Sequence, residues 1–288
     1  MIRAQTLSRW IEENSEAAEA LLFDIDGTLV RGGTALPGAL GLVEMLDRKR
    51  IPYLLLTNDA NHSHEEKAAR LADAGLEIPP THIVSAGDVI SEVVGERDLA
   101  GQPFFVMGEL GTPNYAEAAG LRITRELAEL AACRGVIVGE ENYHWEPTFN
   151  AVINFFIAHP SALFVVPNPD SYWPDSQGGI AIGAGGKARF ICSILDDYGA
   201  HIEPLFLGKP YPAVFAFARR ELERTYGRCI SQAGRILMVG DSLSGDIRGA
   251  NGAGHTSVLV LTGITTEAML SNGRLAAEVI PDVVVQGL

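Results

Sequence analysis

An apolar stretch that ends abruptly at two acidic residues most constrains how this chain can fold. Residues 21–29 read LLFDIDGTL, so apolar side chains are followed by Asp24, Asp26 and then Gly27. The apolar part, residues 20–23, is predicted to be a strand buried on both faces, as in a parallel sheet. Aspartate and glycine are also common in ordinary turns. However, two carboxylates at an apolar strand end repel each other, so we expect a cationic group beside them.

The length and hydropathy of the chain favour a globular protein with more than one part. At 288 residues it exceeds the usual size of a single core, so we expect a core and a second domain. The mean hydropathy is +0.13, and no apolar run has the roughly 20 residues that span a bilayer. Trp10 and Ile11 are followed by acidic residues instead of an apolar block, which argues against a signal peptide. We therefore expect a cytoplasmic protein with no membrane partner.

The charge and the cysteines exclude two further classes of site. The net charge is −14, from 36 acidic residues against 22 Lys and Arg, and no basic stripe is visible. A nucleic acid partner is therefore not expected, because binding the phosphate backbone requires clustered cations. The three cysteines lie far apart, form no CxxC pair and are expected to be reduced thiols. The seven histidines form no HExxH zinc motif.

The first part of the chain alternates predicted helices and strands. A short helix over residues 5–18 precedes the first strand, with its apolar residues expected to pack on the sheet. A helix then opens at Pro37 and ends in the basic residues 48–50. A buried strand over 52–56 follows, and a capping box predicts a helix over 63–74. This β-α-β-α order is typical of a doubly wound parallel sheet.

A second, smaller α/β unit is predicted from residue 87 to residue 203. Its predicted strands cover residues 104–107, 135–138 and 163–166, and its helices lie near 114–119, 124–131 and 148–158. Two of its loops stand out: Asn168-Pro169-Asp170 and a glycine-rich stretch at 178–187. We expect this unit to be inserted into a core formed by residues 1–86 and 204–288.

The core is then predicted to resume with further strands of the first sheet. A strand over 205–207 ends at Lys209, and a helix over about 211–226 follows. The next strand, 236–239, ends at Asp241, with Asp246 one turn later. Strands over 257–261 and 283–285 close the sheet. The predicted fold is therefore α/β, a doubly wound parallel sheet with an inserted α/β domain.

Four predicted strands of this sheet stop at a polar residue, namely Asp24, Thr57, Lys209 and Asp241. In an open parallel sheet, ligands bind beyond the carboxyl ends of the strands, where the strand order reverses. We therefore expect these ends to form one site. With Asp26 and Asp246, the two terminal aspartates form an all-oxygen acidic cluster, which suits Mg²⁺.

The same set of residues suits a phosphate group. Lys209, Thr57 and Asn58 offer a cation and neutral donors for its oxygens. Asp24 can attack phosphorus and become an aspartyl phosphate. Asp26 can protonate the leaving oxygen and then take a proton from the attacking water. Asp246 is expected either at the metal or as a residue that orients a metal-bound water or Lys209.

These four motifs together resemble those of the haloacid dehalogenase-like (HAD) phosphatases. The motifs read DIDGT at 24–28, LTN at 56–58, GKP at 208–210, and GD at 240–241 with Asp246 downstream. The insert between the second and third motifs is similar to the α/β cap of the NagD-type subgroup, and Asn168-Pro169-Asp170 is similar to its cap loop. One position departs from the family pattern, since Asp59 stands where an asparagine is common.

The resemblance implies a Mg²⁺-dependent phosphatase on a Rossmann-like core. Asp24 would be the nucleophile and Asp26 the acid and base. The metal would be held by Asp24, Asp241 and the backbone carbonyl of Asp26. Asn168 and Asp170 of the cap are the candidates for contacts with the substrate. The expected partner is a small phosphorylated metabolite, such as a sugar phosphate, glycerol phosphate, phosphoglycolate or nucleoside monophosphate. Caps of this subgroup often pair, so a homodimer is possible.

Other readings of single motifs compete with this one. Residues 240–243 read GDSL, a block of serine esterases, but His255 alone lies downstream and Gly252 stands where that family needs an aspartate. Lys187 follows two glycines as in a P-loop, but Ala188 replaces the required Ser or Thr. Two alternatives stay open on the same fold: a phosphotransferase, and a non-catalytic protein that binds a phosphorylated ligand.

Overall fold

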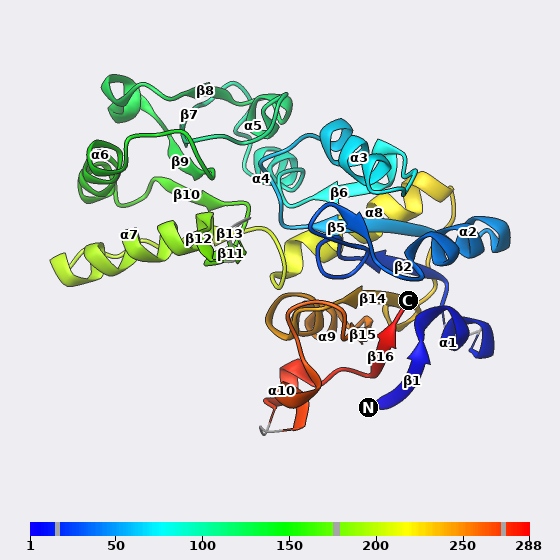
Figure 1. The fold of residues 1–288 in the computed structure, drawn as a ribbon. Helices are drawn as coiled ribbons and strands as arrows, with labels where there is room; N and C mark the ends of the chain where they lie inside the picture. The colour runs from blue at the N-terminus through cyan, green and yellow to red at the C-terminus, as the bar shows by residue number, and fades with distance from the viewer. Residues whose placement is uncertain (15–17, 175–178, 272–274) are drawn as a thin grey trace. The chain divides into compact units, whose positions relative to one another are not determined.

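The computed structural model describes residues 1–14, 18–174, 179–271 and 275–288 (Figure 1). Its contacts divide the chain into two compact units. Unit 1 comprises Met1–Thr57, His64–Val84 and Lys209–Leu288, and unit 2 comprises Asn58–Ser63 and Ser85–Gly208. The long segment of unit 2 thus runs from 85 to 208, against the 87 to 203 predicted from sequence. None of the helices in the described ranges is both long and apolar enough to cross a membrane.

Unit 1 is built on a seven-stranded sheet. Its spatial order is β1 (Ile2–Thr6), β16 (Val283–Gly287), β15 (Thr256–Val260), β14 (Ile236–Gly240), β2 (Ala20–Phe23), β5 (Tyr53–Thr57) and β6 (Ile83–Ser85). All neighbouring pairs from β1 to β5 are parallel. From β2 the order runs outward through β14 on one side and through β5 on the other, which is the doubly wound arrangement. The predicted α/β fold class is confirmed.

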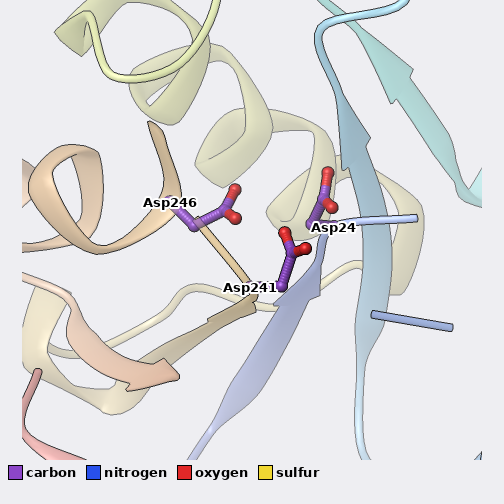
Figure 2. A group of neighbouring side chains, drawn as sticks. All are labelled: Asp24, Asp241 and Asp246. Carbon is purple, nitrogen blue, oxygen red and sulfur yellow. The ribbon is translucent and has the colours of Figure 1, made fainter. Parts of the chain in front are cut away.

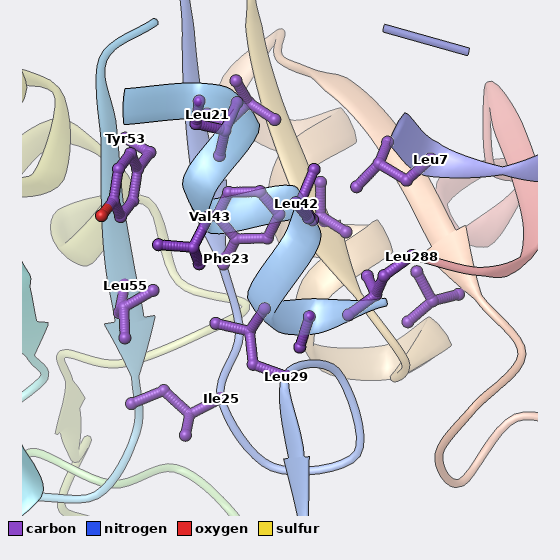
Figure 3. Close-up of a cluster of buried hydrophobic side chains, with 14 of the residues drawn as sticks. Leu7, Leu21, Phe23, Ile25, Leu29, Leu42, Val43, Tyr53, Leu55 and Leu288 are labelled. Carbon is purple, nitrogen blue, oxygen red and sulfur yellow. The ribbon is translucent and has the colours of Figure 1, made fainter. Parts of the chain in front are cut away.

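Helices cover the sheet of unit 1. Their bounds are α1 (Leu7–Glu13), α2 (Ala39–Lys49), α3 (His64–Asp73), α8 (Pro212–Tyr226), α9 (Arg248–Ala253) and α10 (Glu267–Ser271). Apolar residues of α1, α2 and α3 pack against every second residue of the strands, such as Leu21, Phe23 and Leu55 (Figure 3). Because side chains alternate along a strand, the intervening residues face the opposite side, where Leu259 and Val284 pack with Ile247. Three-residue 3₁₀ helices lie at Pro80–His82, Ala233–Arg235 and Ala277–Val279.

The beginning of the chain differs from the prediction of one helix over 5–18. Residues 2–6 form strand β1, which pairs with β16 at the far end of the sequence. Its sequence, IRAQT, carries no apolar run because an edge strand needs none, so no local signal identified it. Helix α1 is correspondingly short, and its Leu7, Trp10 and Ile11 are buried in the core of unit 1.

Unit 2 contains a parallel sheet of five strands. Their order is β13 (Leu205–Phe206), β10 (Leu163–Val166), β9 (Gly135–Val138), β7 (Pro103–Met107) and β8 (Arg122–Thr124). The helices are α4 (Ile90–Glu96), α5 (Tyr115–Ala118), α6 (Trp145–Ala158), α7 (Ala184–Tyr198) and a 3₁₀ helix at Leu127–Ala132. A separate antiparallel hairpin joins β11 (Tyr172–Pro174) to β12 (Ile180–Ile182). Phe105, Phe156 and Phe164 lie in the core of this unit.

Strand β13 belongs to the sheet of unit 2, so its predicted place in the first sheet is wrong. Val165 and Val166 of β10 pair with Leu205 and Phe206. Phe206 packs against the unit 2 core, which gives this short strand its apolar partner. Lys209 therefore follows a strand of the second sheet, although it belongs to unit 1 by its own contacts.

The predicted glycine-rich loop over 178–187 is also wrong for most of its length. Residue 178 lies outside the described residues, Ile180–Ile182 is strand β12, and α7 begins at Ala184. The glycines at the start of α7 admit a neighbouring loop at close range. A Cβ on Gly185 would overlap the carbonyl oxygen of Pro169, so only glycine fits there.

Candidate active site

Two neighbouring strands place acidic residues at the same edge of the unit 1 sheet. Strand β2 ends at Phe23, which pairs with Val239 of β14, so Asp24 and Asp241 leave the sheet at adjacent positions. The Asp24 N–H donates to the Val239 carbonyl at 2.9 Å and continues the ladder past the strand end. These two strands are the ones at which the strand order reverses. The predicted meeting of Asp24 and Asp241 is therefore observed.

Asp246 completes an acidic trio with these two residues. It lies in a π-helical turn, Leu243–Ile247, directly after β14. Asp24, Asp241 and Asp246 each offer an oxygen, and these oxygens lie within 4.8 Å of one another (Figure 2). Asp241 and Asp246 are 4% and 2% exposed. Burial, followed by the charge of Asp246, raises the pKa of Asp241 to about 6. The trio thus concentrates negative charge where water does not screen it.

Lys209 supplies the cation that the sequence leads us to expect. Its Nζ lies 2.5 Å from Asp24 Oδ1 and 2.7 Å from Asp246 Oδ1. Burial alone would lower the pKa of Lys209, but Asp24 and Asp246 outweigh burial and raise that pKa. Burial also raises the pKa of Asp24, and Lys209 opposes this effect. The lysine is therefore charged and holds two of the three acids.

Two further oxygens of the trio accept hydrogen bonds from backbone amides. Asp246 Oδ2 accepts from the Ser242 N–H at 3.0 Å, so both oxygens of Asp246 have protein partners. Asp241 Oδ2 accepts from the Ile264 N–H at 2.7 Å. Of the two roles predicted for Asp246, orienting Lys209 is the one that these contacts favour.

Asp26 follows Asp24 by two residues in the turn after β2, and Thr57 ends the neighbouring strand β5. Asp26 is exposed and bridges to Val30 through its backbone, in a turn that the Gly27 N–H closes by donating to the Val30 carbonyl at 2.7 Å. A small hairpin, β3 (Val30–Arg31) and β4 (Thr34–Ala35), follows. Thr57 is the buried last residue of β5, the neighbour of β2. Their roles as acid/base and phosphate ligand remain predictions.

The other predicted residues form a second group, within unit 2. Asn58 Nδ2 donates to Asp170 Oδ2 at 3.1 Å. Asn168 Oδ1 accepts from the Asp170 N–H at 2.9 Å, and Asn168 Nδ2 donates to Glu140 Oε1 at 2.9 Å. The loop 168–170 is thus fixed by its own hydrogen bonds. Contact of these residues with a substrate remains a prediction.

Two charged residues of unit 2 were not identified as site candidates from sequence. Glu140 and Lys187 are both buried, with Lys187 Nζ donating to the Glu140 carbonyl and lying 3.6 Å from Glu140 Oε2. They line a cavity of about 240 Å³ together with aromatic residues that include Trp145 and Trp173. Lys187 was visible in sequence only as the end of an imperfect P-loop, whereas in the structure it lies in the first turn of α7 and pairs with a carboxylate.

Asp59, the departure from the family pattern, stabilises its own loop. Its Oδ1 accepts from the Asn61 N–H at 2.7 Å, its Oδ2 lies 2.9 Å from His62 Nδ1, and its carbonyl accepts from Ser85 Oγ. The extra acid is therefore used in structural contacts within unit 2.

The serine esterase reading finds no support in the contacts of its residues. Ser242 Oγ accepts from the Gly245 N–H at 3.0 Å and caps the turn that carries Asp246. His255 Nδ1 lies 3.0 Å from the Ala233 carbonyl oxygen. The contacts of these described residues therefore do not include the serine–histidine hydrogen bond that a catalytic triad requires.

Comparison with known proteins agrees with this geometry. Residues 21–122 match the haloacid dehalogenase-like hydrolase family, and residues 206–288 match a second, HAD-hydrolase-like family. Mouse chronophin is 30% identical over 273 residues, covering 89% of this chain and 87% of chronophin. The chain belongs to the HAD-like hydrolases. The acids at the ends of β2 and β14 thus lie where the resemblance implied a HAD active site.

The subgroup is that of NagD. The ribonucleotide monophosphatase NagD of Escherichia coli K12 is 27% identical over 247 residues, 85% of this chain and 88% of NagD. Its solved structure superposes with a TM-score of 0.76 at 24% identity, over 94% of this chain and 97% of NagD. A glycerol phosphate phosphatase of Mycobacterium tuberculosis, solved in complex with magnesium, has the same fold, at 24% identity and a TM-score of 0.77, over 98% of this chain and 77% of that one. This HAD-like enzyme is a phosphoric monoester hydrolase.

Removal of the Lys209 charge should destabilise the metal-free protein. In EDTA at about pH 7.5, Lys209→Met should lower the free energy of unfolding by about 3–5 kcal/mol, because it leaves buried carboxylates without their partner. Denaturant unfolding measures the loss. Lys49→Met is the matched control: Lys49 pairs with Glu12 on the surface at 3.0 Å, and its loss should stay below about 1 kcal/mol.

The penalty for Lys209→Met should also depend on pH. The pKa of Asp241 is raised to about 6, above the ~3.9 of an unfolded aspartate, so the folded state binds the proton more tightly. Stability from this group is therefore present at low pH and lost as the pH rises through about 6. The loss caused by Lys209→Met should be smaller at about pH 5 than at about pH 7.5. An equal loss in the free energy of unfolding for Lys209→Met and Lys49→Met would contradict this account.

Proposed function

We propose that this chain is a Mg²⁺-dependent phosphatase that hydrolyses small phosphomonoesters through an aspartyl phosphate on Asp24. One observation carries the proposal: Asp24 stands at the end of β2 with a lysine 2.5 Å away and two further acids beside it. A carboxylate nucleophile, a phosphate-binding cation and oxygen ligands for a metal are thereby gathered in one place.

The acidic trio fits a bound Mg²⁺. Three carboxylate oxygens lie within 4.8 Å of one another, and Lys209 Nζ forms ion pairs with Asp24 and Asp246. Burial and neighbouring charge raise the pKa of Asp241, so a cation there would relieve the repulsion. Hard oxygen donors are the ligands that Mg²⁺ prefers. Asp24, Asp241 and the carbonyl of Asp26 would hold it, and the ion would offset repulsion between the carboxylate and the phosphate dianion.

The residues of the chain account for the two chemical steps. In the first, a carboxylate oxygen of Asp24 forms a bond to phosphorus while the bond to the leaving oxygen breaks. Asp26 gives that leaving oxygen a proton. In the second, Asp26 takes a proton from water, the water oxygen bonds to phosphorus, and the bond to Asp24 breaks. Lys209 and the Thr57 hydroxyl would hold the non-bridging oxygens during both steps. Transfer to an alcohol instead of water remains an alternative second step.

The covalent path of the chain supports a role for unit 2 in substrate choice. The chain first leaves unit 1 directly after Thr57, and after a second excursion that begins at Ser85 it returns to unit 1 at Lys209. Two of the connections to unit 2 are therefore adjacent to residues of the proposed site. A domain attached in this way can close over the site as a lid and exclude water. Asn168 and Asp170 would then contact the leaving group. A covered site favours small metabolites. A cytoplasmic location and a homodimer remain predictions.

Asp24→Asn should remove turnover of p-nitrophenyl phosphate, because the amide is a poor nucleophile and a poor metal ligand. Asp73→Asn, an exposed aspartate of α3, is the control and should keep full activity. Excess EDTA should abolish activity and added Mg²⁺ restore it. The uncatalysed reaction is so slow, with enzymatic accelerations up to ~10²¹, that even weak activity is measurable above it. Full activity of Asp24→Asn, or in EDTA, would overturn the proposal.

Asp26→Asn should reveal a general acid through the leaving group. A sugar alkoxide needs a proton as its bond to phosphorus breaks, whereas p-nitrophenolate needs much less help. In single-turnover phosphorylation of Asp24, this variant should therefore slow alkyl phosphates more than p-nitrophenyl phosphate. Equal losses on both substrates would count against this role.

Small phosphomonoesters should be turned over with kcat/KM at least ~100-fold above any phosphorylated protein, which is about 2.7 kcal/mol of transition-state binding. Asp170→Ala should change the ranking of small substrates more than the rate with p-nitrophenyl phosphate. Asp73→Ala serves as the control and should leave the ranking as it is. Phosphoproteins that match the best metabolite, or a ranking unmoved by Asp170→Ala, would show that unit 2 is not a lid.

A further inference from the structure

A loop that follows β15 contacts Asp241 through its backbone. The loop comprises residues 262–264, and its Ile264 N–H donates to Asp241 Oδ2 at 2.7 Å. The Ile264 side chain is 57% exposed. The loop therefore holds Asp241 through a main-chain donor. This contact does not depend on the Ile264 side chain.

Two glycines enclose the same carboxylate. A Cβ on Gly263 would overlap Asp241 Oδ2 and would lie 2.6 Å from Asp241 Cβ. A Cβ on Gly27, in the turn after β2, would lie 2.9 Å from Asp241 Cγ and 3.1 Å from Gly263 Cα. Backbone from two separate loops thus approaches Asp241 more closely than any side chain would permit.

The loop is also attached to the turn that carries the proposed catalytic residues. Thr262 Oγ1 donates to the Gly27 carbonyl at 2.7 Å, and the Arg31 guanidinium donates to the Thr262 carbonyl. The position of Asp241 is therefore tied to the turn that follows Asp24 by contacts that involve neither Lys209 nor Asp246.

We infer that residues 262–264 form a positioning loop that fixes Asp241 as a metal ligand through one oxygen, Oδ1. The Ile264 amide and the two glycines occupy the surroundings of Oδ2, which leaves Oδ1 for the ion. Mg²⁺ requires near-octahedral geometry with single-oxygen ligands, whereas Ca²⁺ accepts both oxygens of one carboxylate. The loop therefore favours Mg²⁺ over Ca²⁺. This inference rests on the proposed metal-dependent function.

Metal-dependent thermal stabilisation without substrate tests the inference, because an ion that binds only the folded state raises Tm. Tm of the whole chain is measured at increasing concentrations of Mg²⁺ or of Ca²⁺. Each titration gives the ion concentration at which half of the maximal rise in Tm is reached. Gly263→Ala should raise that concentration for Mg²⁺ by about 10-fold or more, the effect typical of lost support to a metal ligand. The change for Ca²⁺ should be smaller. Thr262→Val removes only the hydrogen bond from the hydroxyl to the Gly27 carbonyl, and it should also raise the half-maximal Mg²⁺ concentration.

Ile264→Ala is the matched control. It keeps the backbone amide, so the half-maximal concentrations of both ions should stay unchanged. Circular dichroism verifies that each variant folds, and Thr262→Val tests the loop even if Gly263→Ala does not fold. Three results would overturn the inference. The first is unchanged Mg²⁺ binding in folded Gly263→Ala and Thr262→Val. The others are a loss of Ca²⁺ binding as large as that of Mg²⁺ binding, and a loss of Mg²⁺ binding in Ile264→Ala as large as in Gly263→Ala. No Mg²⁺-dependent rise in the unsubstituted protein would instead contradict the proposed metal site itself.

Discussion

The ion pair of Lys209 with Asp24 and Asp246 is the interaction on which the site depends. Three aspartates lie close together at a buried edge of the sheet, where their repulsion is not screened by water. The ammonium forms ion pairs with Asp24 and Asp246, and the Ile264 N–H donates to Asp241. Three carboxylates thus lie beside one ammonium, which is the arrangement that the proposed Mg²⁺ ion would complete and in which Asp24 would act as the proposed nucleophile.

The parallel sheet explains how distant segments produce this arrangement. Strands β2 and β14 are neighbours at the point where the strand order reverses, so both chain segments leave the sheet at one edge. The tight turn after Asp24 and the loop after β15 then close around Asp241. Each segment contributes one or two side chains, and the pairing of β2 with β14 brings Asp24 and Asp241 together although they lie far apart in sequence.

The sequence allowed the fold class and the acidic trio to be predicted, because a buried strand that stops at a charged residue is a local signal. Asp24, Asp241 and Lys209 were found in this way. The sheet to which β13 belongs was not predicted correctly. The apolar residues of this short strand fit either sheet, and only the pairing with β10 shows which sheet it joins. The contact of the Ile264 amide with Asp241 carries no side-chain signal. Asp59 was visible as a departure, but its role in capping its own loop appears only in the structure.

The central claim is that Asp24 becomes phosphorylated, and trapping the intermediate tests it most directly. A single turnover of a phosphomonoester with Mg²⁺ is quenched in acid, where an acyl phosphate survives long enough for peptide mass spectrometry. The account predicts a phosphoryl group on the peptide that contains Asp24, located at that residue and formed before inorganic phosphate is released. Turnover without any covalent phosphate, or with the phosphoryl group on another residue, would contradict it.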